Sequence, residues 1–414
     1  MLALRLTRLA HPAVQLRRLT VAAASAGTGF LLLCSLAYGL GHPDDPGAAL
    51  LRLSWCAVPL AATVYLTVAV ARTDPATRPR TALSALGLGP GRLMAVSAAT
   101  TALTCTAGSL LALLLFLHLR GGLTGLPFDG AASGVLAARE RLPVPGALTL
   151  LAIVPALASI AVAWSLRPRE PRPAPRAAAP APQDADAPAD AGPAGPGTGA
   201  APEDTDPHRP LPPRRPPAGL PWGIAVLAVG LTVEAYAGRS PASRTALPGH
   251  LAADSAPVLA GWLLTALGLA LAGPGLTHLC GRLLQAVRPG AVRLLAGRVL
   301  MEEAARIGRP LGVVCAVASG AYAAVALSGG AAPDPGPLTA LGALLVAGCA
   351  VAALLTAAVE ARQSRSATIA ALRRLGAPAT TLRSAAALRA GALLALFVPL
   401  TLVIAALAAL PLAR

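Results

Sequence analysis

Long apolar stretches constrain this chain more than any other feature of its sequence. Hydrophobic residues make up 55% of the 414 positions and charged residues only 13%, whereas about a quarter of the residues in a soluble domain are charged. About nine stretches are long enough, at roughly 20 residues each, to cross a bilayer as helices. They are Leu19–Leu40, Leu50–Ala71, Met94–His118, Gly146–Leu166, Gly219–Ala237, Ala256–Leu279, Pro310–Leu327, Leu338–Val359 and Ala385–Leu410. The sequence therefore predicts an all-α polytopic integral membrane protein.

Two motifs recur at one spacing and indicate an internal duplication. Asp45-Pro46-Gly47 returns as Asp334-Pro335-Gly336, and the pair Leu86-Gly87 returns as Leu375-Gly376, in each case 289 positions later. Repeats of this kind set the architecture of a chain, and membrane transport proteins are commonly built from repeated halves. We predict four segments: a first repeat of four spans at 1–166, a Pro/Ala-rich disordered cytoplasmic linker at 167–217, a two-helix connector at 218–280 and a second repeat of three spans at 281–414.

The distribution of arginine predicts the orientation of the chain. With the N-terminus inside, the predicted inner segments hold about three quarters of the arginines, as the positive-inside rule requires. These segments are 1–18, 72–93, 167–218, 280–309 and 360–384. The net charge of +16 therefore indicates a lipid bilayer rather than nucleic acid as the partner, and with 3% aromatic residues the chain has little material for stacking on bases. We predict a multi-pass protein of the cell membrane with a cytoplasmic N-terminus.

The residue types that are absent exclude several chemistries. Every basic residue is an arginine, so the chain has no P-loop lysine, and any use of ATP requires a separate ATPase subunit. The six cysteines lie in or next to predicted spans and form no CxxC pair; we expect them to be free, apolar core residues. The histidines are scattered without metal-ligand spacing. We therefore expect no catalytic residues, no metal site and no cofactor.

One inner segment of each repeat carries the pattern of a short surface helix. Ile369, Leu372 and Leu375 recur at every third position and form one apolar face. Gly376 can adopt the left-handed conformation that ends a helix. We expect a short helix at the inner membrane surface between two spans. In the first repeat Ala82, Leu83 and Leu86 form the corresponding face and Gly87 ends it. The alternative is an ordinary arginine-rich inner loop.

These segments resemble the FtsX-like, or MacB-type, permease family of ABC transporters. The matching residues of the second repeat are Arg362, Arg365, Leu372, Arg373, Leu375, Gly376 and Ala377, and those of the first, which match more weakly, are Arg78, Arg80, Leu83, Leu86 and Gly87. The resemblance implies a P-loop ATPase in trans that docks on both segments and powers export or another transmembrane movement. Large duplicated members have a 4 + 2 + 4 arrangement of spans, so the second repeat here lacks the last one. The loops between the first two spans of each repeat are also shorter than in many relatives.

A charged segment before the second repeat and an acidic residue within a span are further functional candidates. The lead-in Arg293–Arg309 mixes charge with apolar residues at helical spacing, which is typical of a helix along the inner surface. Glu234 lies in an apolar run, where a carboxylate is a functional candidate, although near the outer end of its span it could instead reach water.

The alternatives to a permease subunit are an ion-gradient-driven secondary transporter and a non-transporting or degenerate membrane scaffold. A homodimer and a hetero-oligomer both stay open.

Overall fold

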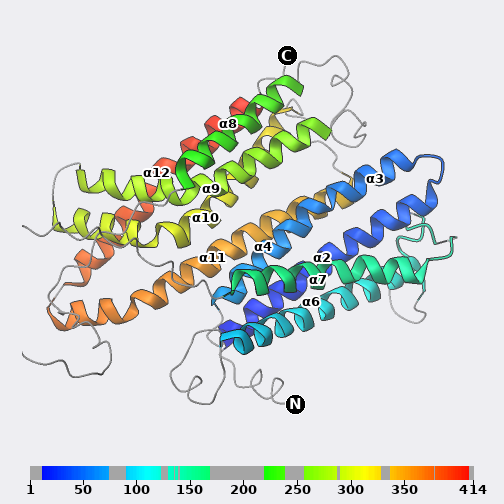
Figure 1. The fold of residues 1–414 in the computed structure, drawn as a ribbon, viewed down its shortest axis with the longest axis horizontal. Coiled ribbons are helices and arrows are strands. Elements are labelled where there is room, and N and C mark those ends of the chain that lie inside the picture. The colour runs from blue at the N-terminus through cyan, green and yellow to red at the C-terminus, as the bar shows by residue number, and fades with distance from the viewer. Residues whose placement is uncertain are drawn as a thin grey trace, which may run out of the picture. The chain divides into compact units, whose positions relative to one another are not determined.

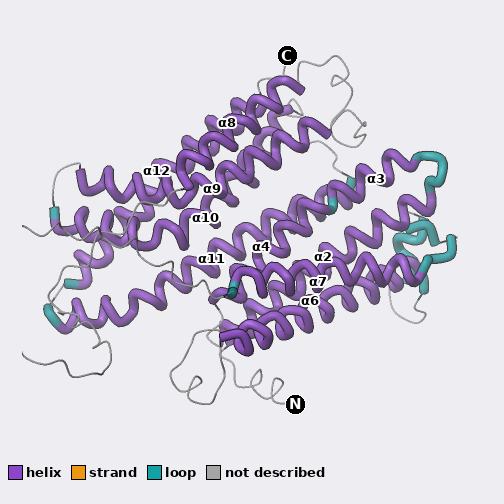
Figure 2. Tube along the Cα trace, viewed as in Figure 1, coloured by secondary structure: helices purple, strands orange, loops and turns teal. Residues whose placement is uncertain are grey.

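Helices, joined by turns and loops, make up most of the part of the chain whose structure is described. The computed structural model describes residues 12–73, 90–122, 129–134, 136–138, 140–167, 219–237, 256–286, 290–327, 336–376 and 378–409. No strand occurs in these residues, as Figure 2 also shows. The predicted linker lies outside them, apart from Arg167.

The described residues contain ten helices, which Figure 1 shows in chain order by colour. They are α2 (Pro12–Gly41), α3 (Pro46–Trp55), α4 (Ala57–Thr73), α6 (Pro90–Arg120), α7 (Val144–Ser165), α8 (Gly219–Ala237), α9 (Ala256–Ala286), α10 (Ala291–Leu327), α11 (Pro337–Arg374) and α12 (Ala379–Ala409). The helices α3 and α4 are separated only by a turn at Cys56 and together form one apolar segment.

Eight helical segments of the described chain are long and apolar enough to cross a membrane. They coincide with eight of the nine predicted spans, so the prediction of an all-α multi-pass membrane protein is confirmed. The ninth, Pro310–Leu327, is helical and forms the C-terminal half of α10, but it is not among the eight segments. Backbone groups in a bilayer must be satisfied within the chain, which is why such apolar segments are helices.

The helices α2, α4, α6 and α7 form a bundle whose contacts include buried hydroxyl groups. Ser25 in α2 donates to the carbonyl of Cys105 in α6 at 2.8 Å, and the hydroxyls of Thr28 and Thr63 join α2 to α4 at 2.8 Å. Ser109 in α6 donates to the carbonyl of Leu151 in α7 at 3.2 Å. Small hydroxyl residues let membrane helices approach closely and hydrogen-bond across the contact.

Glycines bring α9 against α8 and α10. A Cβ atom on Gly273 of α9 would overlap the carbonyl oxygen of Gly308 in α10, and one on Gly223 of α8 would overlap the backbone of Ala272 in α9. Only glycine permits this approach, which is the usual basis of tight helix contacts in a membrane. The helix α12 joins the group through a buried cluster that contains Phe397.

The helix α11 packs against the first bundle as well as against α10. Cys349 and Ala353 of α11 belong to the same buried cluster as Leu66 of α4 and Val21 of α2. The Sγ of Cys349 lies 3.9 Å from the hydroxyl of Thr63 in α4. All six cysteines of the chain are free and buried, as predicted.

Two surface helices expected as separate elements are instead parts of longer ones. The segment Arg293–Arg309 is continuous with the apolar half of α10, because Pro310 lies inside the helix without ending it; membrane helices tolerate proline where neighbours satisfy the freed backbone groups. The segment after Val359 likewise continues α11, since its Ala, Glu, Arg and Gln residues are good helix formers.

Candidate functional site

The C-terminal extension of α11, defined as residues 360–374, carries most of the predicted site. The helix has 38 residues and at 1.5 Å per residue is about 57 Å long, nearly twice the hydrocarbon thickness of a bilayer of about 30 Å. It ends at Arg374, with Leu375 as its cap and Gly376 at φ +88°. This left-handed glycine is the stop that the sequence predicts.

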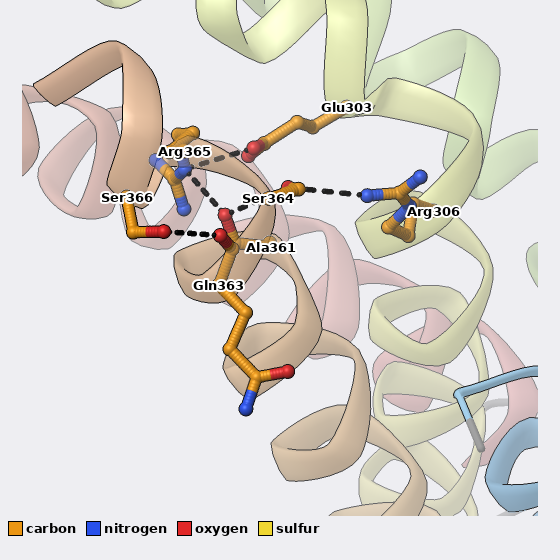
Figure 3. A network of polar contacts seen from close by, with 7 residues as sticks. All are labelled: Glu303, Arg306, Ala361, Gln363, Ser364, Arg365 and Ser366. Carbon is orange, nitrogen blue, oxygen red and sulfur yellow. Dashed lines mark hydrogen bonds and ion pairs between the residues drawn. The ribbon is translucent and has the colours of Figure 1, made fainter. Parts of the chain in front are cut away.

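An ion pair ties this extension to α10. The Nε of Arg365 lies 2.9 Å from Oε1 of Glu303, and both side chains are largely buried (Figure 3). The same Nε donates to the carbonyl of Ala361 at 2.8 Å, one helical turn earlier. A charged hydrogen bond with a second acceptor holds the arginine side chain in one geometry.

A second contact beside this ion pair joins the same two helices. Arg306 of α10 donates through Nη1 to the hydroxyl of Ser364 at 3.3 Å, and Ser364 in turn donates to the carbonyl of Ala361 at 3.1 Å. In Figure 3 the side chains of Glu303 and Arg306 both point from α10 toward α11. We call Glu303, Arg306, Ser364 and Arg365 the brace.

Burial raises the pKa of the Glu303 carboxyl above its ordinary value. Three guanidinium groups, of Arg365, Arg389 and Arg306, act in the opposite direction, and the carboxylate of Glu302 adds to the rise. Burial disfavours the charged form of a carboxyl, whereas nearby arginines favour it. The Glu303 carboxyl of the brace therefore lies under the influence of arginines from α10, α11 and α12.

The predicted apolar face of the extension has little cover from the rest of the described chain. Ile369 and Leu372 are half-buried, and Leu375 is 84% exposed. Arg362 and Arg373 are exposed as well. The end of α11 thus exposes Leu375 next to Arg373 and Arg374.

The corresponding site of the first repeat lies outside the described residues. This applies to Arg78, Arg80, Leu83, Leu86 and Gly87. The structure does describe the helix end just before them, where Nη1 of Arg17 in α2 donates to the hydroxyl of Thr73 in α4 at 3.2 Å. Arg306 stands 289 positions after Arg17, and each of the two arginines donates to a hydroxyl group of another helix.

Glu234 lies at the contact between α8 and α9. Its side chain is 1% exposed, and Thr265 donates to its Oε1 at 3.0 Å. The second carboxylate oxygen has no hydrogen-bond partner among the described residues. Gly261 provides the space, because a Cβ atom there would lie 2.6 Å from Cγ of Glu234. This burial does not match the alternative in which the carboxylate reaches water at the end of its span.

Sequence reasoning did not identify the brace. The sequence pattern indicates only a surface helix for Glu303 and Arg306, and it does not identify the partner of Arg365. The spacing of Arg17 and Arg306 was the available signal, since it equals the spacing of the two repeated motifs. In the described residues no cluster of three or more His, Cys, Asp or Glu side chains could hold a metal ion.

No family model matches the sequence, and comparisons with curated proteins and with solved structures find no similar protein.

Proposed function

We propose that this chain is the permease subunit of an ABC transporter of the FtsX-like type. In this proposal the chain hydrolyses no ATP itself, and a P-loop ATPase in trans docks on the extension of α11 and on the corresponding segment before α6. The energy of the ATPase moves an unidentified substrate across or out of the membrane. The residues of the first docking segment are Arg78, Arg80, Leu83, Leu86 and Gly87, and those of the second are Arg362, Arg365, Ile369, Leu372, Arg373, Leu375 and Gly376.

Helix boundaries support a duplication with spans in the order 4 + 2 + 3. The helix α12 (Ala379–Ala409) begins and ends 289 positions after α6 (Pro90–Arg120) begins and ends. Side-chain contacts follow the same shift: Thr67 donates to the carbonyl of Thr63, and Thr356 donates to that of Ala352. In this arrangement α10, α11 and α12 correspond to α2, α4 and α6.

The observation that carries the proposal is the continuity of α11 from an apolar span into a braced, exposed end. A load applied near Leu375 would pass along one unbroken helix into the span, and through Arg365 and Glu303 into α10. A flexible loop would absorb such a load.

The orientation of the proposal follows the arginine-rich segments. The extension of α11 and the start of α2 then lie in the cytoplasm, where an ATPase can reach them, and the chain crosses the cell membrane. The contact between Arg17 and Thr73 supports part of this arrangement, because it places the start of α2 beside the end of α4.

Co-purification tests the docking assignment. We expect a P-loop ATPase to co-purify with the full chain and to be lost by more than about tenfold after Leu372→Asp with Leu375→Asp, since the apolar contact of two leucines is removed. Val144→Asp is the matched control, because Val144 is also an exposed apolar residue, at the start of α7. An ATPase that stays bound to the folded double variant contradicts the assignment. Absence of any ATPase, with no solute movement in vesicles, favours a scaffold.

Glu234 supports a second candidate, an ion-gradient-driven secondary transporter. Ionisable groups within spans mark ion and proton pathways, and this carboxyl is buried between two helices next to a threonine hydroxyl. Transport that is abolished by Glu234→Gln and is insensitive to ATP depletion would favour this function over the permease.

A further inference from the structure

A single carboxyl group is enclosed where α8 meets α9. The side chain of Glu234 is 1% exposed, and it is the only acidic side chain of these two helices. Thr265 of α9 donates to its Oε1 at 3.0 Å, whereas Oε2 has no hydrogen-bond partner among the described residues. The carboxyl group therefore has one polar contact, and one of its oxygen atoms is buried without any.

Glycines close the space around this carboxyl group. A Cβ atom on Gly261 of α9 would lie 2.6 Å from Cγ of Glu234 and 3.1 Å from the carbonyl oxygen of Gly230. One on Gly230 of α8 would overlap the backbone nitrogen and the hydroxyl of Thr265. The two backbones thus touch beside the carboxyl group. A metal cation with a shell of about six oxygen ligands would require the helices to move apart, whereas a proton requires no added space.

No charged side chain of the described residues acts on this carboxyl group. The helices α9 and α12 contact α8, and their ionisable side chains are His278, Cys280, Arg282, Arg383 and Arg389. His278 comes 13 positions after Thr265, which is about 20 Å along the helix. Burying a charge without a counter-charge is so unfavourable that a carboxyl group takes its neutral form instead.

We propose that Glu234 and Thr265 form a reversible proton-binding site between α8 and α9. The proton is held on Oε2, while the hydroxyl of Thr265 donates to Oε1. When the proton is released, the O–H bond breaks, its electron pair stays on Oε2 and the proton passes to a water molecule. The inference goes beyond the functions proposed above, because it rests on the geometry of this contact and holds for a transporter and a scaffold alike.

Release of the proton should loosen the contact between the two helices. The carboxylate that remains requires water or another donor at Oε2, and the glycine backbones in close contact leave no space for it. The helices then separate at Gly230 and Gly261. The occupancy of the proton site is thereby coupled to the packing of α8 against α9.

Infrared difference spectroscopy of the full chain in phosphatidylcholine vesicles tests the site. At neutral pH we expect a carbonyl band of a protonated carboxyl group in the wild type and its loss in Glu234→Gln. Glu303→Gln is the matched control, because Glu303 is also largely buried but pairs with an arginine; it should leave the Glu234 band in place.

A pair of threonine variants tests the same site without changing the carboxyl group, and decides the question if Glu234→Gln does not fold. Thr265→Val should shift the band to higher frequency, because it removes the hydrogen bond to Oε1. Thr265→Ser, which keeps a hydroxyl group, should leave the band near its wild-type position. Equal positions in the two variants would show that the band does not come from Glu234.

Raising the pH should remove the band from the wild type, and amide hydrogen exchange in α8 should then rise by about fivefold or more relative to α6 of the same chain. A band that is absent at neutral pH, that Glu234→Gln retains or that persists until the chain unfolds would overturn the reversible proton site. Loss of the band on addition of Na⁺ at constant pH would overturn it in favour of a metal cation.

An equal rise of exchange in α8 and α6 would overturn the coupling to helix packing. No ATPase, nucleotide or ion gradient is present in these measurements. Their result is therefore separate from that of the test of the proposed function.

Discussion

Arg365 of α11 and Glu303 of α10 form an ion pair of 2.9 Å beyond the apolar parts of their helices. Removing one partner of such a pair leaves an uncompensated buried charge, which costs more than the pair itself contributes. The two helices therefore resist separation at this point. In the proposed mechanism this resistance is what lets a movement of the extension reach two spans at once.

Disruption of the brace should destabilise the chain far more than disruption of an exposed pair. We expect Arg365→Ala and Glu303→Ala to couple by about 1 kcal/mol or more in a double-mutant cycle of unfolding in detergent. Arg298 and Glu302 form the control pair, at 3.7 Å between exposed side chains on α10, with an expected coupling of about 0.5 kcal/mol or less. Equal coupling in the two cycles would show that the brace has no special role.

The pH dependence of stability should contain a contribution from Glu303. Because burial raises the pKa of its carboxyl in the folded chain, the folded state holds this proton more tightly than the unfolded state. Stability should therefore fall as pH rises from the ordinary value of 4.5 through the raised folded value. Glu303→Gln should remove this fall, and Arg365→Ala should extend it to higher pH. Thermal unfolding midpoints across this range measure the effect, and identical pH profiles for the wild type and Glu303→Gln would contradict it.

The contact between α9 and α10 should not tolerate a methyl group at its closest point. We expect Gly273→Ala to cost about 1–3 kcal/mol, because the Cβ atom would overlap the carbonyl of Gly308 and force the helices apart. Gly320→Ala is the control within α10, since a Cβ atom there meets nothing within 4 Å. This control should be neutral or slightly stabilising. Similar unfolding midpoints for the two variants would contradict the packing described.

Thiol labelling of intact cells should reveal the proposed topology. A membrane-impermeant reagent should label Asp44→Cys, in the turn between α2 and α3, and should reach Arg373→Cys only after permeabilisation. A cysteine added after Arg414 should behave like Asp44→Cys if the chain crosses the membrane nine times. The reverse pattern at the first two sites would invert the orientation.

The sequence was sufficient to predict the helical class and the approximate position of eight spans. Apolar length alone determines a membrane helix, so Gly219–Ala237 was predicted with the bounds that α8 has. The stop at Gly376 was equally predictable, because a left-handed residue at a helix end favours glycine.

Packing between distant segments could not be predicted in this way. A short surface helix and an extension of a span have the same local pattern, and the residues after Val359 continue α11 only because nothing between them breaks the helix. The partner of Arg365 is 62 positions earlier, at Glu303, and periodicity within one helix carries no information about a second one.

The central claim is that an ATPase binds the end of α11, and a cross-link from Leu375 tests it most directly. With a benzophenone on Leu375→Cys, irradiation of membranes from the producing cells should give one main protein adduct, identified by mass spectrometry as a P-loop ATPase. Adding Leu372→Asp should abolish it, while Val144→Asp should leave it unchanged. An ATPase that co-purifies with the chain but forms no adduct at Leu375, or an adduct that survives Leu372→Asp, would contradict the account.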